Sequence, residues 1–175
     1  MSNLRKQSAE ARANKLLTSL GIVGIPVPVD KIARALGARV RYSPLDEELS
    51  GFIYIKDGVP IIGVNSLHHP NRQRFTIAHE IAHLQLHREF IASAVHVDKQ
   101  FVESVLKRDA SSATGKERLE VDANQFAAAL LMPAALLDEI LEASPIDIDD
   151  ETSIEEWAQE FVVSKAALQY RIRNL

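Results

Sequence analysis

The stretch from Asn71 to His87 limits most narrowly what this chain can fold into. It contains neither glycine nor proline, and its apolar residues recur at helical spacing, so we expect one uninterrupted helix. Within it stands the pattern HEIAH, from His79 to His83. Because a helix turns about 100° per residue, the two histidines lie about 40° apart on one face, with Cβ atoms roughly 6 Å apart. Both imidazoles can therefore reach one metal ion.

Glu80 follows the first histidine and projects about 100° further round the helix. A carboxylate in that place stands beside a metal ion rather than on it. There it can take a proton from water and later deliver it to a leaving amine. The residues between the histidines are apolar, which indicates a buried helix, and buried polar groups without partners are costly. We therefore predict a zinc site; the alternative interpretation is a pair of hydrogen-bonded core histidines.

Two histidines do not complete a catalytic zinc site, which usually has three protein ligands and one open position. The chain has no cysteine, so thiolate ligands and disulfides are excluded. The metzincin extension needs a glycine and a histidine where this chain has Leu86 and Glu89. A carboxylate on a second helix is the other common solution. The helical stretch KERLEVDANQFAAALL offers three candidates: Glu117, Glu120 and Asp122.

Position on the helical wheel distinguishes these carboxylates. The apolar stripe centres about 40° from Leu119, which puts Glu120 about 60° from the centre and Asp122 about 100° away on the other side. Glu120 is also longer by a methylene, so we favour it as the third ligand and keep Asp122 as the alternative. Asn124 follows Glu120 by one turn and is expected to orient it. Without a metal, Glu120 would be a helix-start acid stabilised by the helix dipole.

The remaining patterns predict an α+β fold, mostly helical, with a small antiparallel sheet of about three strands. ARVRY alternates, and GFIYI and PIIGV flank Asp57-Gly58, which is a hairpin turn signal. Helical spacing marks the stretch that ends at Gly21, the short segment KIARALG, and segments on both sides of Met132-Pro133. We expect a domain over 1–142 and a C-terminal helical segment over 143–175.

Other polar residues are candidates for the same site. Arg72 and Arg74 could bind a substrate carboxylate or carbonyl, although the alternative is a solvated helix start. Tyr54 could stabilise an oxyanion, but strand tyrosines usually pack. The strand PIIGV could hold an extended substrate if it is a sheet edge. The spare histidines are expected at the surface or at helix caps: His68, His69, His87 and His96.

The segment 157–175 resembles a helix-turn-helix, with Ser164 as the cap of its second helix. Lys165, Arg171 and Arg173 give it a local positive bias on a chain with a formal charge of −4. One interpretation is that this segment contacts DNA phosphates or a protein partner. The other is that it closes the core, and we favour it because three basic residues make a small footprint for DNA.

The chain shows no signal for a membrane. No stretch is apolar for the length that a membrane span needs, and the N-terminus lacks the apolar run of a signal peptide. We therefore expect a cytoplasmic protein without membrane contact.

RFTIAHEIAHLQLH followed by EVDANQFAAALLMP resembles the ImmA/IrrE family of gluzincin-like metallopeptidases, as does LSGFIYI with PIIGVNSLHHPNRQR upstream. The likeness runs from about Ala11 to about Glu142. It implies a zincin-like domain that holds Zn²⁺ through His79, His83 and Glu120, with Glu80 as the catalytic base.

Members of this family are typically encoded beside helix-turn-helix repressors and cleave them. The resemblance thus implies a zinc-dependent endopeptidase whose substrate is such a repressor, so that cleavage relieves repression. The alternative is a regulatory protein that keeps its zinc without hydrolysing anything and acts by binding a repressor or DNA.

Overall fold

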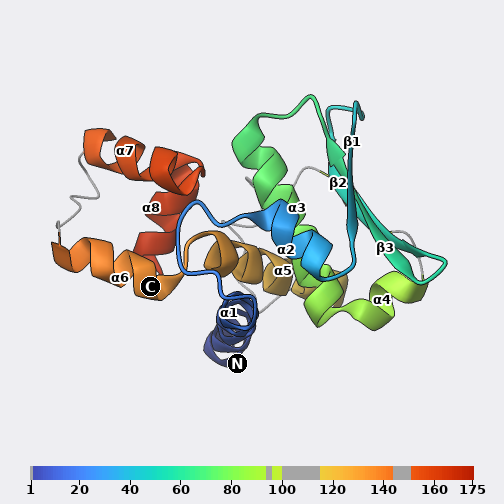
Figure 1. Ribbon diagram of the computed structural model, residues 1–175, viewed down its shortest axis with the longest axis horizontal. Helices are drawn as coiled ribbons and strands as arrows, with labels where there is room; N and C mark the ends of the chain where they lie inside the picture. The colour runs from blue at the N-terminus through green and yellow to red at the C-terminus, as the bar shows by residue number, and fades with distance from the viewer. Residues whose placement is uncertain (1, 94–95, 100–114, 144–150) are drawn as a thin grey trace.

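Figure 1 shows the computed structural model of the chain, which describes residues 2–93, 96–99, 115–143 and 151–175. The helices are α1 (Ser2–Ser19), α2 (Val29–Ala35), α3 (Pro70–Leu86), α4 (Arg88–Ser93), α5 (Gly115–Leu131), α6 (Ala134–Ala143), α7 (Glu151–Phe161) and α8 (Lys165–Arg173). The strands are β1 (Arg39–Ser43), β2 (Leu49–Lys56), β3 (Val59–Asn65) and β4 (His96–Lys99). This set of elements confirms the predicted α+β class.

The described strands form one sheet in the order β1-β3-β2-β4. The expected hairpin is present, because β2 and β3 pair antiparallel and Lys56 lies opposite Val59. Asp57 and Gly58 have φ angles of 52° and 78°. A two-residue hairpin turn whose twist matches the strands needs this left-handed backbone at both positions, which explains why Asp-Gly stands here.

The sheet differs from expectation in being mixed and in having a fourth strand. β1 pairs with β3 in parallel, because residues 44–48 carry the chain past β3 before β2 begins. Asn65 at the end of β3 holds this loop: its Oδ1 accepts from the Leu45 backbone nitrogen at 3.2 Å, and its Nδ2 donates to the Leu49 carbonyl at 2.8 Å. As a result PIIGV is an interior strand, so it is not the open edge considered for substrate binding.

The sheet packs against α3 at close range. Gly51 of β2 marks the approach, because a Cβ there would lie 2.4 Å from Thr76 Cγ2 and 2.5 Å from the Gly63 carbonyl oxygen. α3 also packs against α5, and Figure 1 shows the sheet on one side of α3 and helices α6 to α8 on the other. Every residue from Thr76 to Leu84 is therefore buried, as the sequence predicted for this helix.

The C-terminal helix pair is present as expected, with Ser164 capping α8 by accepting from the Ala167 nitrogen at 3.2 Å. The turn between α7 and α8 contacts the start of α3. Asn71 Nδ2 donates to the Val163 carbonyl at 2.8 Å, and Arg74 Nε donates to the Val162 carbonyl at 3.3 Å. The pair is thus hydrogen-bonded to the helix that carries the histidine motif.

Arg171 adds a second connection between α8 and the rest of the chain. Its side chain is buried, donates to the Met132 carbonyl at 3.0 Å and forms an ion pair with Glu10 of α1. The division expected between 1–142 and 143–175 stays a prediction, and residues 144–150 lie outside the described part of the chain.

No single helix in the described residues is long and apolar enough to cross a membrane. The residues of α5 and α6 reach that length only as a pair, with a bend of 47° between them.

Candidate metal centre

The helix α3 begins and ends at positions that its sequence explains. Pro70 occupies its first turn, where a missing N–H costs nothing, and His69 caps it by accepting from the Asn71 nitrogen at 3.2 Å. The backbone nitrogen of His87 donates to the His83 carbonyl at 2.9 Å at the other end. The histidine motif therefore lies on regular helix, which keeps the four-residue spacing of its histidines on one face.

Three side chains from α3 and α5 converge at the interface of these helices. His79 Nε2 and His83 Nε2 are 3.0 Å apart, and Glu120 Oε2 lies 3.2 Å from the first and 3.7 Å from the second. Both histidines are fully buried, and the Glu120 side chain is 12% exposed. Three potential metal ligands thus point at one small volume.

The donor set fits a tetrahedral zinc ion. Zinc–ligand bonds of about 2.0–2.1 Å at tetrahedral angles place neighbouring ligand atoms roughly 3.3 Å apart. The three separations of 3.0, 3.2 and 3.7 Å bracket that value. Two imidazoles and one carboxylate also match the donor chemistry of catalytic zinc, which leaves its fourth position open.

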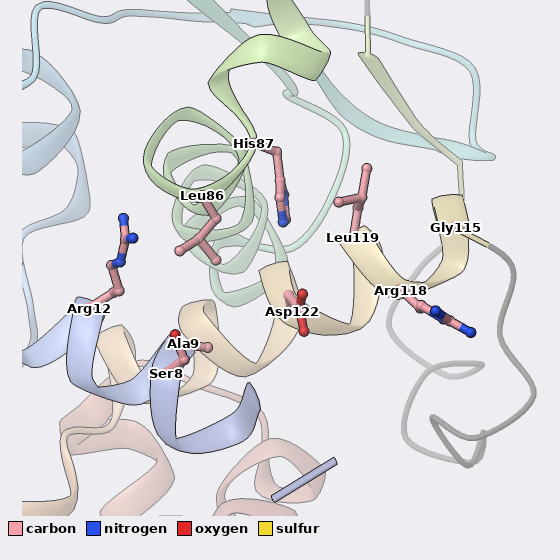
Figure 2. A pocket seen from close by; sticks show the side chains of 9 residues that line it. All are labelled: Ser8, Ala9, Arg12, Leu86, His87, Gly115, Arg118, Leu119 and Asp122. Atoms are coloured by element: carbon pink, nitrogen blue, oxygen red, sulfur yellow. The ribbon is translucent and has the colours of Figure 1, made fainter. Parts of the chain in front are cut away.

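The structure separates the two carboxylates that the sequence left as alternatives. Among the described residues, the group that could hold a metal consists of His79, His83 and Glu120. Asp122 lies outside this group and lines a neighbouring cavity instead, as Figure 2 shows. The choice of Glu120 over Asp122 as the third ligand stays a prediction, and the place of Glu120 in this group supports it.

Each histidine of the group has a partner for its other ring nitrogen. His79 Nδ1 lies 3.0 Å from Asn124 Oδ1, so Asn124 orients a histidine and not Glu120, which was the expected partner. His83 Nδ1 lies 3.1 Å from Nδ1 of His87. Such contacts fix the tautomer and the plane of a metal-binding imidazole.

His87 is the residue whose part in the site the sequence did not reveal. It was expected at the surface or as a cap, and it does follow α3 as the C-cap residue, but its side chain is buried and faces His83. The signal was present, because His83 and His87 repeat the four-residue spacing of His79 and His83. That spacing puts all three imidazoles along one face of the helix.

Glu80 is fully buried in α3 and is not part of the converging group. Its place between the two histidines in the sequence puts it next to the metal position on the helix surface, as the wheel predicts. Its role as an acid and base stays a prediction.

The other candidate residues mostly have structural partners. Arg72 Nη2 donates to Ser50 Oγ at 2.8 Å, which ties α3 to β2. His68 Nε2 contacts the Glu47 carbonyl at 3.1 Å, in the loop before β2. Tyr54 lies beside Phe52 on β2, with ring centroids 6.0 Å apart. Its neighbour Ile53 points into the core beside α3, so strand alternation puts Tyr54 on the face away from the histidines.

Arg74 connects three parts of the chain. Besides the bond to Val162, its Nη2 donates to the Val27 carbonyl at 2.9 Å. Burial lowers the pKa of Arg74, and the charge of Asp30 acts in the opposite direction. These bonds give Arg74 a structural role rather than the solvated position that one interpretation assigned to it. The last spare histidine, His96, lies on β4 opposite Ile53.

A cavity of about 360 Å³ opens beside the metal centre. Figure 2 shows it between the middle of α1, the end of α3 and the beginning of α5. His87 forms part of its wall and contacts the metal centre through His83. The cavity is lined by Ser8, Ala9, Arg12, Leu86, His87, Gly115, Arg118, Leu119 and Asp122.

The convergent site can now be compared with known proteins. The model of the peptidase family M78, described as the IrrE N-terminal-like domain, matches residues 33–173. The chain belongs to the ImmA/IrrE family. The match includes both helices of the metal centre and the C-terminal helix pair.

One relative in the ImmA/IrrE family is the radiation response metalloprotease IrrE of Deinococcus deserti. It is 38% identical over 82 residues, which cover 46% of this chain and 25% of that protein. A Mycobacterium tuberculosis transcriptional regulator has a similar fold, with a TM-score of 0.64 at 20% identity. That match covers 94% of this chain and 46% of the regulator, so the chain spans from a quarter to just under half of these two proteins.

Proposed function

We propose that this ImmA/IrrE family member is a zinc-dependent endopeptidase of the gluzincin type. The observation that carries the proposal is the convergence of His79, His83 and Glu120 within 4.8 Å of one another. These residues would hold the zinc ion, which when bound supplies a Lewis acid that polarises the scissile carbonyl and activates water. Membership of a metallopeptidase family supports the same conclusion.

Glu80 is the acid and base in this proposal. It is next to His79 in the sequence and is buried, so bulk water does not solvate its carboxylate. Its carboxylate takes a proton from the attacking water and then delivers it to the nitrogen of the leaving amine. Asn124 contributes by holding the ring of His79 through its Oδ1.

The substrate in this proposal is a protein, and specifically a helix-turn-helix repressor encoded nearby, so that cleavage relieves repression in the cytoplasm. Family membership supports this choice. The printed name of the fold neighbour, a transcriptional regulator, is consistent with a role in regulation, although it describes that protein.

The competing hypothesis is a zinc-containing regulator that works by binding a repressor or DNA. If the protein bound DNA, three basic residues of the C-terminal helix would contact it. Two of the three already form ion pairs within the chain. Lys165 Nζ lies 2.8 Å from Glu155 Oε2, and Arg171 is buried against Glu10 and Met132. Lys165 is exposed but paired with Glu155, and Arg173 is exposed, so the set offers too small a footprint for phosphate binding.

Co-expression with the neighbouring repressor separates the two hypotheses. Glu80→Gln keeps the metal ligands and removes the base, which is expected to slow cleavage by about 10²–10⁴-fold. Wild type should cleave the repressor and derepress its promoter, and Glu80→Gln should do neither. If Glu80→Gln derepresses as well as wild type while the repressor stays intact, the protein acts by binding and the endopeptidase proposal is wrong.

A further inference from the structure

The two histidines of the metal centre are held by chemically different partners. His79 Nδ1 faces an amide oxygen, the Oδ1 of Asn124, at 3.0 Å. His83 Nδ1 faces a second imidazole, the Nδ1 of His87, at 3.1 Å. An amide oxygen only accepts hydrogen bonds, whereas an imidazole nitrogen accepts or donates according to its tautomer.

The geometry of the centre decides which tautomer each ring needs. The Nε2 atoms of His79 and His83 face each other and Glu120, so these are the atoms that would bind a metal and they must be bare. In a neutral ring the proton then sits on Nδ1. His83 Nδ1 must therefore donate to His87, and Nδ1 of His87 must be an unprotonated acceptor, with its own proton on Nε2.

We propose that His87 is a positioning residue for the metal centre, an inference that rests on the proposed zinc function. It accepts the Nδ1 proton of His83, so that Nε2 of His83 stays bare and aimed at the ion. This assigns to His87 the part that Asn124 plays for His79.

The backbone around His87 holds its ring in place for this role. The His87 nitrogen donates to the His83 carbonyl at 2.9 Å, and its carbonyl accepts from Phe90 at 2.9 Å and Ile91 at 3.2 Å. His87 is thus fixed both to the end of α3 and to the beginning of α4. Because these hydrogen bonds fix the backbone of His87, its ring stays within reach of His83.

The cavity beside His87 makes the role testable without disrupting the core. His87 lines this space of about 360 Å³, so its imidazole is not enclosed on all sides by packed atoms. A substitution at this position therefore changes the partner of His83 more than it changes core packing. Asp122 lines the same cavity outside the ligand group, which makes Asp122→Asn a matched control.

The first test compares zinc affinities of the full chain by chelator competition. His87→Leu keeps an apolar bulk but removes the acceptor, and zinc affinity should fall about 10–100-fold, as is typical when the outer partner of a metal ligand is lost. His87→Asn places an amide oxygen near the former Nδ1 and should restore most of the affinity. Asp122→Asn should bind zinc like wild type.

The second test reads the tautomers of the zinc-loaded wild-type chain by ¹⁵N NMR of its histidines. We expect His83 to be protonated at Nδ1 and His87 to be bare at Nδ1. This measurement needs no variant, so it holds even where His87→Leu fails to fold. Zinc at Nε2 by itself puts the proton of His83 on Nδ1, so the bare Nδ1 of His87 is the readout that a merely structural His87 would not dictate.

The outcomes separate this inference from the function on which it rests. Wild-type affinity in a folded His87→Leu, or a proton on Nδ1 of His87, would overturn the positioning role alone. A loss in His87→Asn as large as in His87→Leu would also contradict it, because the acceptor is retained. A wild-type chain that binds no zinc would overturn the proposed function and the positioning role together.

Discussion

At the scale of single residues, the choice of the third ligand depends on how α5 is turned toward α3. Glu120 Oε2 reaches both imidazoles, at 3.2 and 3.7 Å, whereas Asp122 points into the cavity two residues further along the same helix. Two residues on a helix are about 200° apart, so both carboxylates cannot face one ion. The rotation of α5 thus decides which carboxylate faces the two histidines.

This geometry predicts that two conservative substitutions differ in their effect on zinc affinity. Glu120→Gln should weaken zinc binding by about 10- to 1000-fold, because a neutral amide replaces a charged ligand. Asp122→Asn changes the same charge on the same helix and should have little effect. A competition titration in which Asp122→Asn loses more affinity than Glu120→Gln would make Asp122 the ligand.

The sequence was sufficient to predict which three side chains converge, but not which residues contact the other ring nitrogens of the histidines. The HEIAH spacing and the apolar stripe of α5 both follow from helix periodicity, so His79, His83 and Glu120 could be selected together. The partner of Asn124 could not be chosen in the same way. Asn124 lies one turn from Glu120 within α5, but its bond crosses to His79 of α3, and that depends on how the two helices pack.

At the scale of secondary-structure elements, the short distance between α3 and the sheet depends on Gly51. A side chain there would collide with Thr76 and with the backbone of the neighbouring strand, so only glycine permits this spacing. The hairpin of β2 and β3 was predictable because its turn residues are local. The parallel pairing of β1 was not, because it depends on contacts of Asn65 with a loop far back in the sequence.

Gly51→Ala should therefore destabilise the fold. Overpacking of this kind typically costs about 1–3 kcal/mol, and the carbonyl of Gly63 at 2.5 Å is backbone that cannot easily move away. Gly24→Ala is the matched control, because a Cβ at Gly24 meets nothing within 4 Å. Urea unfolding should show a lower midpoint for Gly51→Ala alone; equal midpoints for both variants would contradict the close approach of α3 and β2.

At the scale of the whole molecule, the C-terminal helix pair is attached to the rest of the chain by polar bonds to α1, to α3 and to the residue after α5. The α7–α8 turn accepts from Asn71 and Arg74 of α3, and Arg171 reaches Glu10 and Met132. These contacts favour the interpretation in which the pair closes the core. The sequence suggested it from the small number of basic residues, but the use of Arg171 as a buried link was not visible there.

Arg171→Met is expected to weaken this attachment. Methionine keeps much of the side-chain bulk but leaves the Met132 carbonyl and the part-exposed Glu10 carboxylate without their partner, which costs about 1–3 kcal/mol. Arg173→Met, on an exposed residue of the same helix, should be close to neutral. Urea titration gives the free energy of unfolding of both variants. An Arg171→Met protein as stable as Arg173→Met would show that the bonds of Arg171 to Glu10 and Met132 do not stabilise the fold.

The zinc content of two variants at neighbouring positions tests the central claim most directly. His79 is proposed as a ligand and Glu80, the next residue, as a base that does not bind the ion. Elemental analysis of purified protein should find about one zinc per chain in wild type and in Glu80→Gln, and much less in His79→Ala. Full zinc occupancy in His79→Ala, or its loss in a folded Glu80→Gln, would contradict the metal centre described here.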